Sequence, residues 1–267
     1  MHIYVCIKEI QDPEIASSVF RVDENKKEVI PVPGLPLVTS PFDEQAIEAA
    51  LRIRDKMPDT KITLVSLGAM TAQSAIKRGL SMGADDGILV SDTALEAIGG
   101  HGTAHVLAEV IKKAGDFNLI LTGRQAADWD AGVVGCGIAE LLGVPVVTFA
   151  KAVRIENDRA VVERVLDDGF ETVEAALPCV VTISNELGEP RKASLRETMR
   201  AAKKPLAVWT AATLGVAGDA LAEAADRQRR ERLFVPAKDI QCEYFGGASA
   251  NEIARELAAR LVESKLI

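Results

Sequence analysis

The chain has 267 residues, of which 48% are hydrophobic and 26% are charged, an ordinary composition for a globular protein. A net charge of −8 gives no reason to expect nucleic acid as a partner, and no apolar run approaches the roughly 20 residues that cross a bilayer. The four cysteines lie far apart without a CxxC pair, so we expect neither a metal site nor a disulfide framework. Because the N-terminus lacks the charged lead and cleavage site of a signal peptide, we expect a cytoplasmic protein without membrane insertion.

The first half of the chain alternates short apolar runs with segments of helical length. Ser40 and Pro41 mark the start of the first helix, as N-cap and first helical residue. Right-handed crossovers between successive strands then predict an α/β fold with a parallel sheet. The expected strands are 3–7, 62–67, 87–90 and 117–122, and the expected helices are 42–57, 71–82, 101–114 and 131–142.

After Pro145 the pattern changes to short strands joined by turns. Apolar and charged residues alternate from 160 to 177, which predicts an antiparallel ribbon with one solvated face. The chain divides by this pattern into an α/β domain at 1–217 and an extended C-terminal arm at 218–267. The expected elements are strands at 146–148, 152–156, 160–166, 171–177 and 179–184, a polar loop at 185–193, a basic helix at 195–204 and a last helix at 250–264.

Two segments follow expected strands, at the edge where open parallel sheets bind ligands. The segment 40–44 opens a helix, whose first N–H groups attract anions, although a plain capping motif is the simpler interpretation. The loop 123–135 is long, polar and glycine-bearing, which favours binding. In it, Arg124 suits an anion or a flavin ring, and Asp128 and Asp130 suit ribose hydroxyls or the cap of the next helix.

Common catalytic signatures are absent from the sequence. There is no GxSxG elbow, no HExxH, no GxxxxGK[ST] phosphate loop and no GxGxxG after the first strand. We therefore predict no catalytic side chain, and the residues alone indicate a nucleotide-binding α/β protein.

Five segments in chain order resemble motifs of the electron-transfer flavoprotein β subunit family, and together they span nearly the whole chain. They are 5–8 (V-x-V-K in the family), 40–50 (N-P-F-D-E-x-A-x-E-x-A), 80–85 (A-x-A-M-G-A-D), 123–128 (G-[RK]-Q-x-x-D) and 189–195 (E-P-R-x-x-[ST]-L). The resemblance implies a five-stranded, doubly wound parallel sheet related to adenine-nucleotide hydrolase-like domains, with an antiparallel ribbon and a C-terminal arm that contacts an α subunit.

The resemblance also implies a function and its cofactors. Members pair with an α subunit that holds most of an FAD, and the β subunit forms one wall of the flavin site and buries a second nucleotide. That nucleotide is AMP in simple carriers and a second FAD in electron-bifurcating members. The chain would shuttle electrons between a flavin-dependent dehydrogenase and a downstream acceptor, as a carrier rather than a classical enzyme. The alternatives are a bifurcating oxidoreductase that oxidises NADH, and a free-standing nucleotide-binding regulator.

The site residues are carried over motif by motif. Arg124 and Arg164 would lie near a flavin ring and favour its anionic state. The residues implied for cofactor binding are Cys6, Ser40, Pro41, Phe42, Asp43, Leu67, Arg124, Asp128, Trp129, Asp130, Ala131, Gly132, Val133, Val134, Gly135 and Arg164. Those implied for docking the dehydrogenase, within the segment 185–204, are Glu189, Pro190, Arg191 and Leu195. Leu195 is either an exposed anchor or the first apolar contact of the following helix.

The chain departs from the family pattern at four of these positions. Ser40 stands where Asn is usual, and Trp129 is unusual in its loop. Ala131 and Val133 replace a Thr and a Gln that help bind phosphates in many members. The sequence therefore leaves open whether the second nucleotide is AMP or FAD, which dehydrogenase is the partner, and in which direction and pathway electrons flow.

Overall fold

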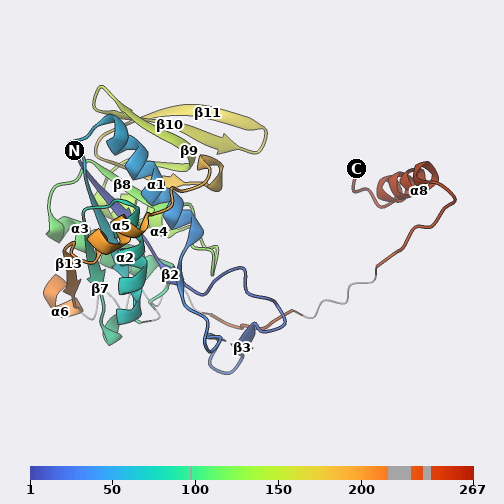
Figure 1. Cartoon of the computed structure of the whole chain (residues 1–267), viewed down its shortest axis with the longest axis horizontal. Coiled ribbons are helices and arrows are strands. Elements are labelled where there is room, and N and C mark those ends of the chain that lie inside the picture. Colours follow the sequence, from blue (N-terminus) through green and yellow to red (C-terminus); the bar gives the residue numbers. More distant parts are fainter. Residues whose placement is uncertain (97, 216–229, 237–241) are drawn as a thin grey trace. The chain divides into compact units, whose positions relative to one another are not determined.

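The computed structural model describes residues 1–96, 98–215, 230–236 and 242–267 (Figure 1). They form two compact units, one of Met1–Arg21 with Val29–Glu231 and one of Val22–Glu28 with Arg232–Ile267. The boundary expected between 217 and 218 lies outside the described residues. In the described part of the chain, no helix combines the length and apolar character that spanning a membrane requires.

The first unit is built on one sheet, which has nine strands in the described residues, in the order β11-β10-β9-β12-β8-β1-β6-β7-β13. In this order, all neighbouring strands from β9 through β12, β8, β1, β6 and β7 to β13 are parallel. The pairs β9–β10 and β10–β11 are antiparallel. The predicted α/β class is confirmed, and β9 and β13 extend the parallel part beyond five strands. The strands are β1 (His2–Cys6), β6 (Lys61–Leu67), β7 (Asp86–Val90), β8 (Leu119–Gly123), β9 (Val146–Glu156), β10 (Arg159–Leu166), β11 (Gly169–Ala176), β12 (Cys179–Ile183) and β13 (Leu206–Trp209).

Helices cover both faces of the sheet. Helices α1 (Pro41–Lys56) and α2 (Gln73–Met82) pack on one face, and α3 (Gly99–Ala114) and α4 (Val134–Leu142) pack on the other. Side chains of a strand alternate between faces, so in β1 Ile3 and Val5 join the first core and Tyr4 and Cys6 join the second. Burial on both sides explains why the central strands read as continuous apolar runs.

The strand order reverses between β1 and β8. Helix α1 carries the chain from β1 to β6 over one face, and α3 carries it from β7 to β8 over the other, so β8 lands on the opposite side of β1. The carboxyl ends of β1 and β8 therefore form the switch point, where α/β sheets of this kind bind ligands.

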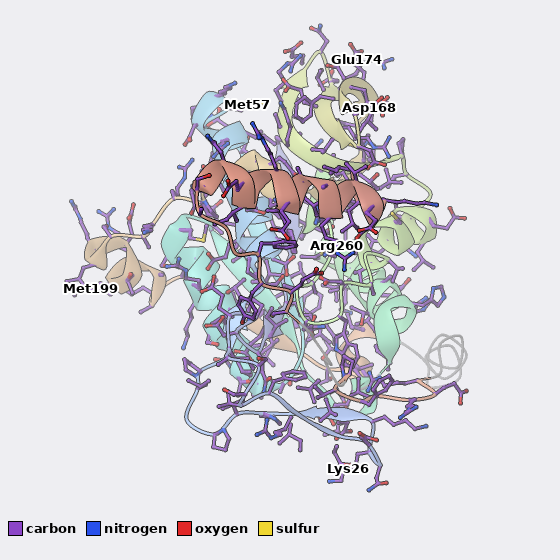
Figure 2. The ribbon with its side chains drawn as sticks, turned by 90° about the vertical axis from the view of Figure 1, so that its right-hand side faces the viewer. Lys26, Met57, Asp168, Glu174, Met199 and Arg260 are labelled. Carbon is purple, nitrogen blue, oxygen red and sulfur yellow. The ribbon has the colours of Figure 1, made fainter. Side chains whose placement is uncertain are left out.

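Strand β9 corrects the prediction of separate strands at 146–148 and 152–156. The chain stays in one strand through Phe149, which has a φ of 58° and donates its N–H to Oγ1 of Thr182 at 3.1 Å. Before Phe149 the strand pairs with β12, and from Ala150 onward it pairs with β10, with register shifts against both. A bulge of this kind bends the strand from the sheet into the ribbon, where Asp168 and Glu174 lie (Figure 2).

Two other predictions need correction. The fourth helix begins at Val134 rather than 131, because Asp130 and Gly132 have positive φ angles of 49° and 64° and cannot continue a helix. Several short elements were not predicted at all, since two to four residues carry little periodic pattern. They are β2 (Glu9–Ile10), β3 (Arg21–Asp23), β4 (Glu28–Ile30), β5 (Val38–Thr39), β13, α6 (Ala211–Leu214) and three 3₁₀ turns, η1 (Met70–Ala72), η2 (Thr93–Leu95) and η3 (Asn185–Leu187).

Two predicted helices are present with small changes in length. The basic helix is α5 (Leu195–Ala201), which starts with a capping box between Ser194 and Glu197. It ends before Lys204, whose ammonium donates to the carbonyl oxygens of Leu80 and Ala84 at the end of α2. In the second unit, α8 (Ala250–Glu263) is capped by Ser249.

Candidate functional site

Asp43, in the first turn of α1, joins the carboxyl ends of the two strands at the switch point. Its Oδ2 accepts a hydrogen bond of 2.8 Å from the backbone N–H of Lys8, which follows β1. Its Oδ1 accepts one of 3.1 Å from the backbone N–H of Gly123, which ends β8. Position 123 requires glycine, because a Cβ atom there would lie 2.5 Å from Oδ1 of Asp43 and 2.7 Å from Cβ of Phe42.

Burial changes the acidity of two groups at this junction. It raises the pKa of the Asp43 carboxyl to about 7, against the opposing effect of the two backbone N–H groups and of the Lys8 charge. Burial, together with the nearby Asp43, raises the pKa of the Cys6 thiol to about 12. Cys6 is therefore a neutral thiol at pH 7, and it contributes packing rather than thiolate chemistry.

Two further contacts connect the loop after β8 to this junction. The Oγ of Ser40 accepts a hydrogen bond of 3.4 Å from the N–H of Ala127, and Nζ of Lys8 lies 2.6 Å from Oδ2 of Asp128. Ser40 is the N-cap residue of α1, as predicted, although its side chain makes no cap hydrogen bond. Pro41 at the first helical position is confirmed.

The start of α4 is the better anion site of the two helix starts. Val133 precedes α4 and offers no capping oxygen, so the first N–H groups of the helix have no side-chain cap. Helix α1, in contrast, begins with Pro41, which lacks an N–H, and places the carboxylate of Asp43 in its first turn. Gly135 lets α4 approach the sheet, because a Cβ there would lie 2.7 Å from side-chain atoms of Thr122 and Thr182.

Two further side chains of the loop that precedes α4 have partners in the structure. Oδ1 of Asp130 accepts a hydrogen bond of 2.7 Å from the side chain of Gln125. Trp129 is 44% exposed, and the guanidinium of Arg230 lies 4.2 Å from the centre of its ring. Ala131 is also exposed and provides no polar side chain.

Arg124 lies between two aromatic rings beside the switch point. Its guanidinium carbon is 4.9 Å from the ring centre of Phe42 and 5.7 Å from that of Phe149. One terminal nitrogen donates to Oγ of Ser184 at 3.3 Å, while the buried Nε has no hydrogen-bond partner in the described part of the chain. Phe149 was missed by the sequence analysis; its left-handed backbone and 40% exposure are visible only in the structure.

Arg164 lies on the ribbon next to the same bulge. Its Nε donates to the carbonyl oxygen of Thr148 at 3.2 Å, and one terminal nitrogen pairs with Glu171 at 2.7 Å. Of the two arginines implied for the flavin, Arg124 thus contacts the ring of Phe149 and Arg164 contacts the residue before it.

The segment after β12 is attached to α1. Arg191 pairs with the 4%-exposed Glu48 at 2.8 Å and with Asp55 at 2.7 Å, and Arg52 donates to the carbonyl oxygen of Leu187 at 2.9 Å. These contacts hold the pKa of both carboxyls below their usual values, and for Glu48 they outweigh desolvation by burial. Beyond this attachment Leu195 is 79% exposed, and Met199 on the same helix is 67% exposed (Figure 2).

Most of the predicted cofactor residues therefore gather at one edge of the sheet. Leu67 ends β6 at this edge, two positions beyond the partner of Cys6 in the register. Glu189 and Pro190 stand apart from the switch point with Arg191 and Leu195, on the segment that α1 supports. Ser184 and Phe149 are additions that the sequence did not single out, and Lys8 belongs to the 5–8 motif but was not assigned a place in the site.

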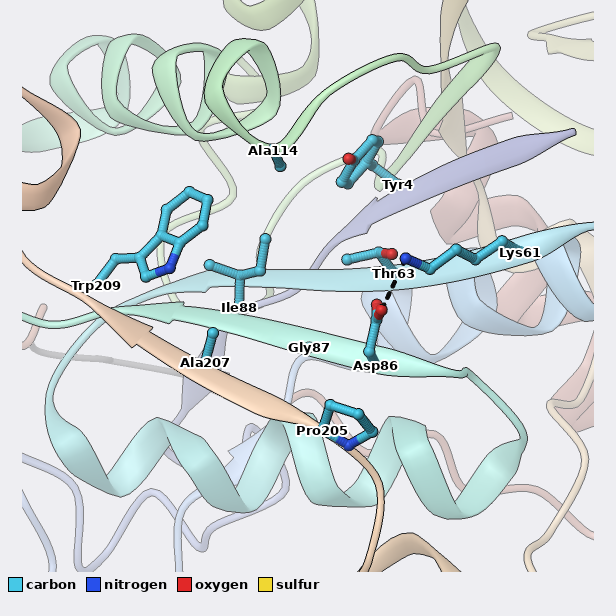
Figure 3. Close-up of a pocket in the computed structure, with 10 residues that line it drawn as sticks. All are labelled: Tyr4, Lys61, Thr63, Asp86, Gly87, Ile88, Ala114, Pro205, Ala207 and Trp209. Atoms are coloured by element: carbon cyan, nitrogen blue, oxygen red, sulfur yellow. Dashed lines mark ion pairs between the residues drawn. The ribbon is translucent and has the colours of Figure 1, made fainter.

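A separate pocket of about 190 Å³ lies on the α3 side of the sheet, where β6 and β7 begin (Figure 3). Tyr4 and Trp209 line it, and Nζ of Lys61 pairs with Oδ2 of Asp86 at 2.9 Å across its floor. Lys61 and Asp86 stand at the amino ends of β6 and β7, the opposite end of these strands from the switch point.

The fold and the junction at its switch point define a doubly wound α/β protein. Residues 34–214 match the sequence model of the electron transfer flavoprotein domain, which is more than half of the chain. The chain belongs to the electron transfer flavoprotein family.

Three relatives illustrate this membership. The caffeyl-CoA reductase-Etf complex subunit CarD of Acetobacterium woodii is 34% identical over the full length of both chains. The electron transfer flavoprotein subunit beta of Megasphaera elsdenii is 35% identical over 88% of each chain. The subunit of the same name from Bos taurus is 40% identical over 73% of this chain and 77% of its own.

Proposed function

We propose that the chain is the β subunit of a heterodimeric electron-transfer flavoprotein. It passes electrons from a flavin-dependent dehydrogenase to a downstream acceptor through an FAD shared with an α subunit. The observation that carries this proposal is the junction of Asp43, Lys8 and Gly123 at the switch point, in a chain whose relatives bear that name over most of their length. The flavin supplies the redox chemistry, and the protein supplies binding and electrostatics.

The residues at the switch point fit an adenine nucleotide. The first turn of α4 offers N–H groups to a phosphate, Asp128 can accept from ribose hydroxyls, and Cys6 and Leu67 offer apolar contact at the strand ends. The nucleotide would be AMP or part of a second FAD. Its binding site includes the segment from Ser40 to Asp43 and the loop from Asp128 to Gly135.

The arginines beside Phe149 fit the edge of a flavin held by the α subunit. Both guanidiniums are fixed by hydrogen bonds or ring contacts, so their charge is positioned before a flavin arrives. A positive charge near the ring lowers the free energy of the anionic reduced flavin relative to the neutral oxidised form. The exposed Leu195 on α5 suits an anchor for the dehydrogenase, and the C-terminal arm would bind the α subunit.

A second candidate function is electron bifurcation with a second FAD and oxidation of NADH. The observation that favours it is the full-length similarity to a subunit of a caffeyl-CoA reductase-Etf complex, because that name joins the flavoprotein to a reductase.

One experiment separates these functions. The chain is purified with the polypeptide that accompanies it, the complex is denatured, and the released nucleotides are quantified by chromatography and visible absorption. One FAD and one AMP per heterodimer are expected for the carrier, and two FAD for bifurcation. Isolation of the chain as a monomer or homodimer that releases no flavin would contradict both functions and leave the free-standing nucleotide-binding regulator.

A further inference from the structure

The candidate nucleotide site is rich in carboxylates. Asp43, Asp128 and Asp130 lie in or beside it, and a phosphate monoester brings a further charge of about −1.5 to −2 at neutral pH. Asp43 is bound by two backbone N–H groups and Asp130 by Gln125, neither of which carries a charge. A cation of the site itself is therefore needed to balance an incoming phosphate.

Arg124 is not the cation that would bind this phosphate. Its backbone N–H donates to the carbonyl oxygen of Ile183, and its guanidinium is fixed between Phe42 and Phe149 with a hydrogen bond to Ser184. These contacts direct its charge toward the β9 bulge, where the proposed flavin lies.

Lys8 has a fixed backbone and an available side chain. Its N–H donates to Asp43, and its carbonyl oxygen accepts from the N–H of Ser40 at 2.9 Å, so its Cα is held at the switch point. Its side chain is 43% exposed and ends 2.6 Å from Oδ2 of Asp128. An ion pair this exposed contributes only about 0–1 kcal/mol, so the ammonium can change partner at little cost.

We propose that Lys8 selects for the phosphate of the nucleotide by exchanging partners. When the nucleotide binds, the ammonium of Lys8 leaves Asp128 for the phosphate at the start of α4, and the released carboxylate of Asp128 accepts from the ribose hydroxyls. The two members of one ion pair thereby bind the phosphate and the ribose of the ligand. This inference rests on the proposed nucleotide site, and it assigns to Lys8 a role that would make up for the missing side-chain donors at Ala131 and Val133.

The test compares AMP with adenosine, which lacks the phosphate. Binding of each is measured by calorimetry to the full chain in complex with its partner, after removal of bound nucleotide. Lys8→Met keeps the length of the side chain and removes its charge, and it is expected to weaken AMP about tenfold to a hundredfold while changing adenosine less than about twofold. Lys8→Arg should restore most of the AMP affinity, and Lys113→Met, an exposed lysine on α3, should change neither ligand.

Asp128→Asn distinguishes exchange from a structural role. Without the competing carboxylate Lys8 is free for the phosphate, so AMP affinity is expected to hold or rise while adenosine affinity falls. Equal weakening of AMP and adenosine by Lys8→Met, in a variant that melts like the parent, would mean that Lys8 only holds the loop, and the inference would be wrong. Failure of the parent to bind either ligand would instead overturn the nucleotide site and the role of Lys8 with it.

Discussion

The two ends of the parallel sheet differ in how their polar groups are arranged. At the amino end, the Lys61–Asp86 pair lies beside an open pocket and connects two neighbouring strands. At the carboxyl end, Asp43 joins segments from β1, α1 and β8 through backbone N–H groups. The comparison teaches that the pocket and the proposed functional site lie at different ends of the sheet, and that the proposed site is marked by the convergence of distant segments on one buried carboxylate.

The largest expected effect is at Gly123. In Gly123→Ala the new methyl group would meet Asp43 and the backbone of Phe42, and neither can move without disturbing α1. We expect a loss of about 3 kcal/mol in the free energy of unfolding, measured by urea denaturation. Gly169→Ala is the matched control, because its Cβ would meet open space in the ribbon turn. If Gly123→Ala lowers the free energy of unfolding no more than Gly169→Ala does, the packing of Gly123 against α1 is not tight.

The pH dependence that Asp43 confers is expected to be smaller when it is expressed per pH unit. Its folded pKa of about 7 lies above the ordinary value of 3.8, so the folded state retains a proton that the unfolded state releases. This term decreases the free energy of unfolding as pH rises from about 4 to about 7, by at most about 1.4 kcal/mol per pH unit. The free energy of unfolding is measured against pH for the parent and for Asp43→Asn. The difference between the two curves gives the pH dependence that Asp43 contributes.

The control for this measurement is Asp59→Asn, an exposed carboxylate in the turn before β6, which should leave the profile unchanged. A difference profile that is flat between pH 4 and pH 7 would show that the two N–H donors keep Asp43 ionised in the folded state. The subtraction also cancels the opposite contribution of His2, whose pKa is lowered mainly by burial.

The smallest effect is expected at the amino end. Lys61→Met removes one partner of an ion pair whose side chains are 52% and 26% exposed, so the free energy of unfolding should change by less than about 1 kcal/mol. The difference should shrink further in 0.5 M salt, which screens exposed charges. A loss comparable to that of Gly123→Ala would remove the contrast between the two ends.

Much of the fold was predictable from the sequence because its elements carry long periodic patterns. Strands β1, β6 and β8 and helices α1 to α3 were found within a few residues. The predicted start of α4 lies three residues too early, because Ala131 and Val133 are compatible with a helix. Only the backbone angles of Asp130 and Gly132 show that the helix cannot begin there. β13 was missed because an edge strand of four residues leaves little pattern.

The candidate site was predictable only in its list of residues. The motifs contain Asp43, Arg124 and Asp128, but they do not show which residues form hydrogen bonds with one another. The N–H of Lys8 is 35 positions from Asp43, and that of Gly123 is 80 positions away. The place of Phe149 depends on a register shift, which sequence periodicity does not encode.

The bulge at Phe149 also limits how the protein can respond to a partner. Because Ala150, directly after the bulge, pairs with both Ile183 of β12 and Arg164 of β10, the strand pairing continues from the sheet into the ribbon. A polypeptide that binds the ribbon therefore meets Arg164 and Arg124 at a spacing that the main chain has already set. The β subunit would act toward the flavin as a rigid template, and the motions that bring redox centres together would belong to the other chains of the complex.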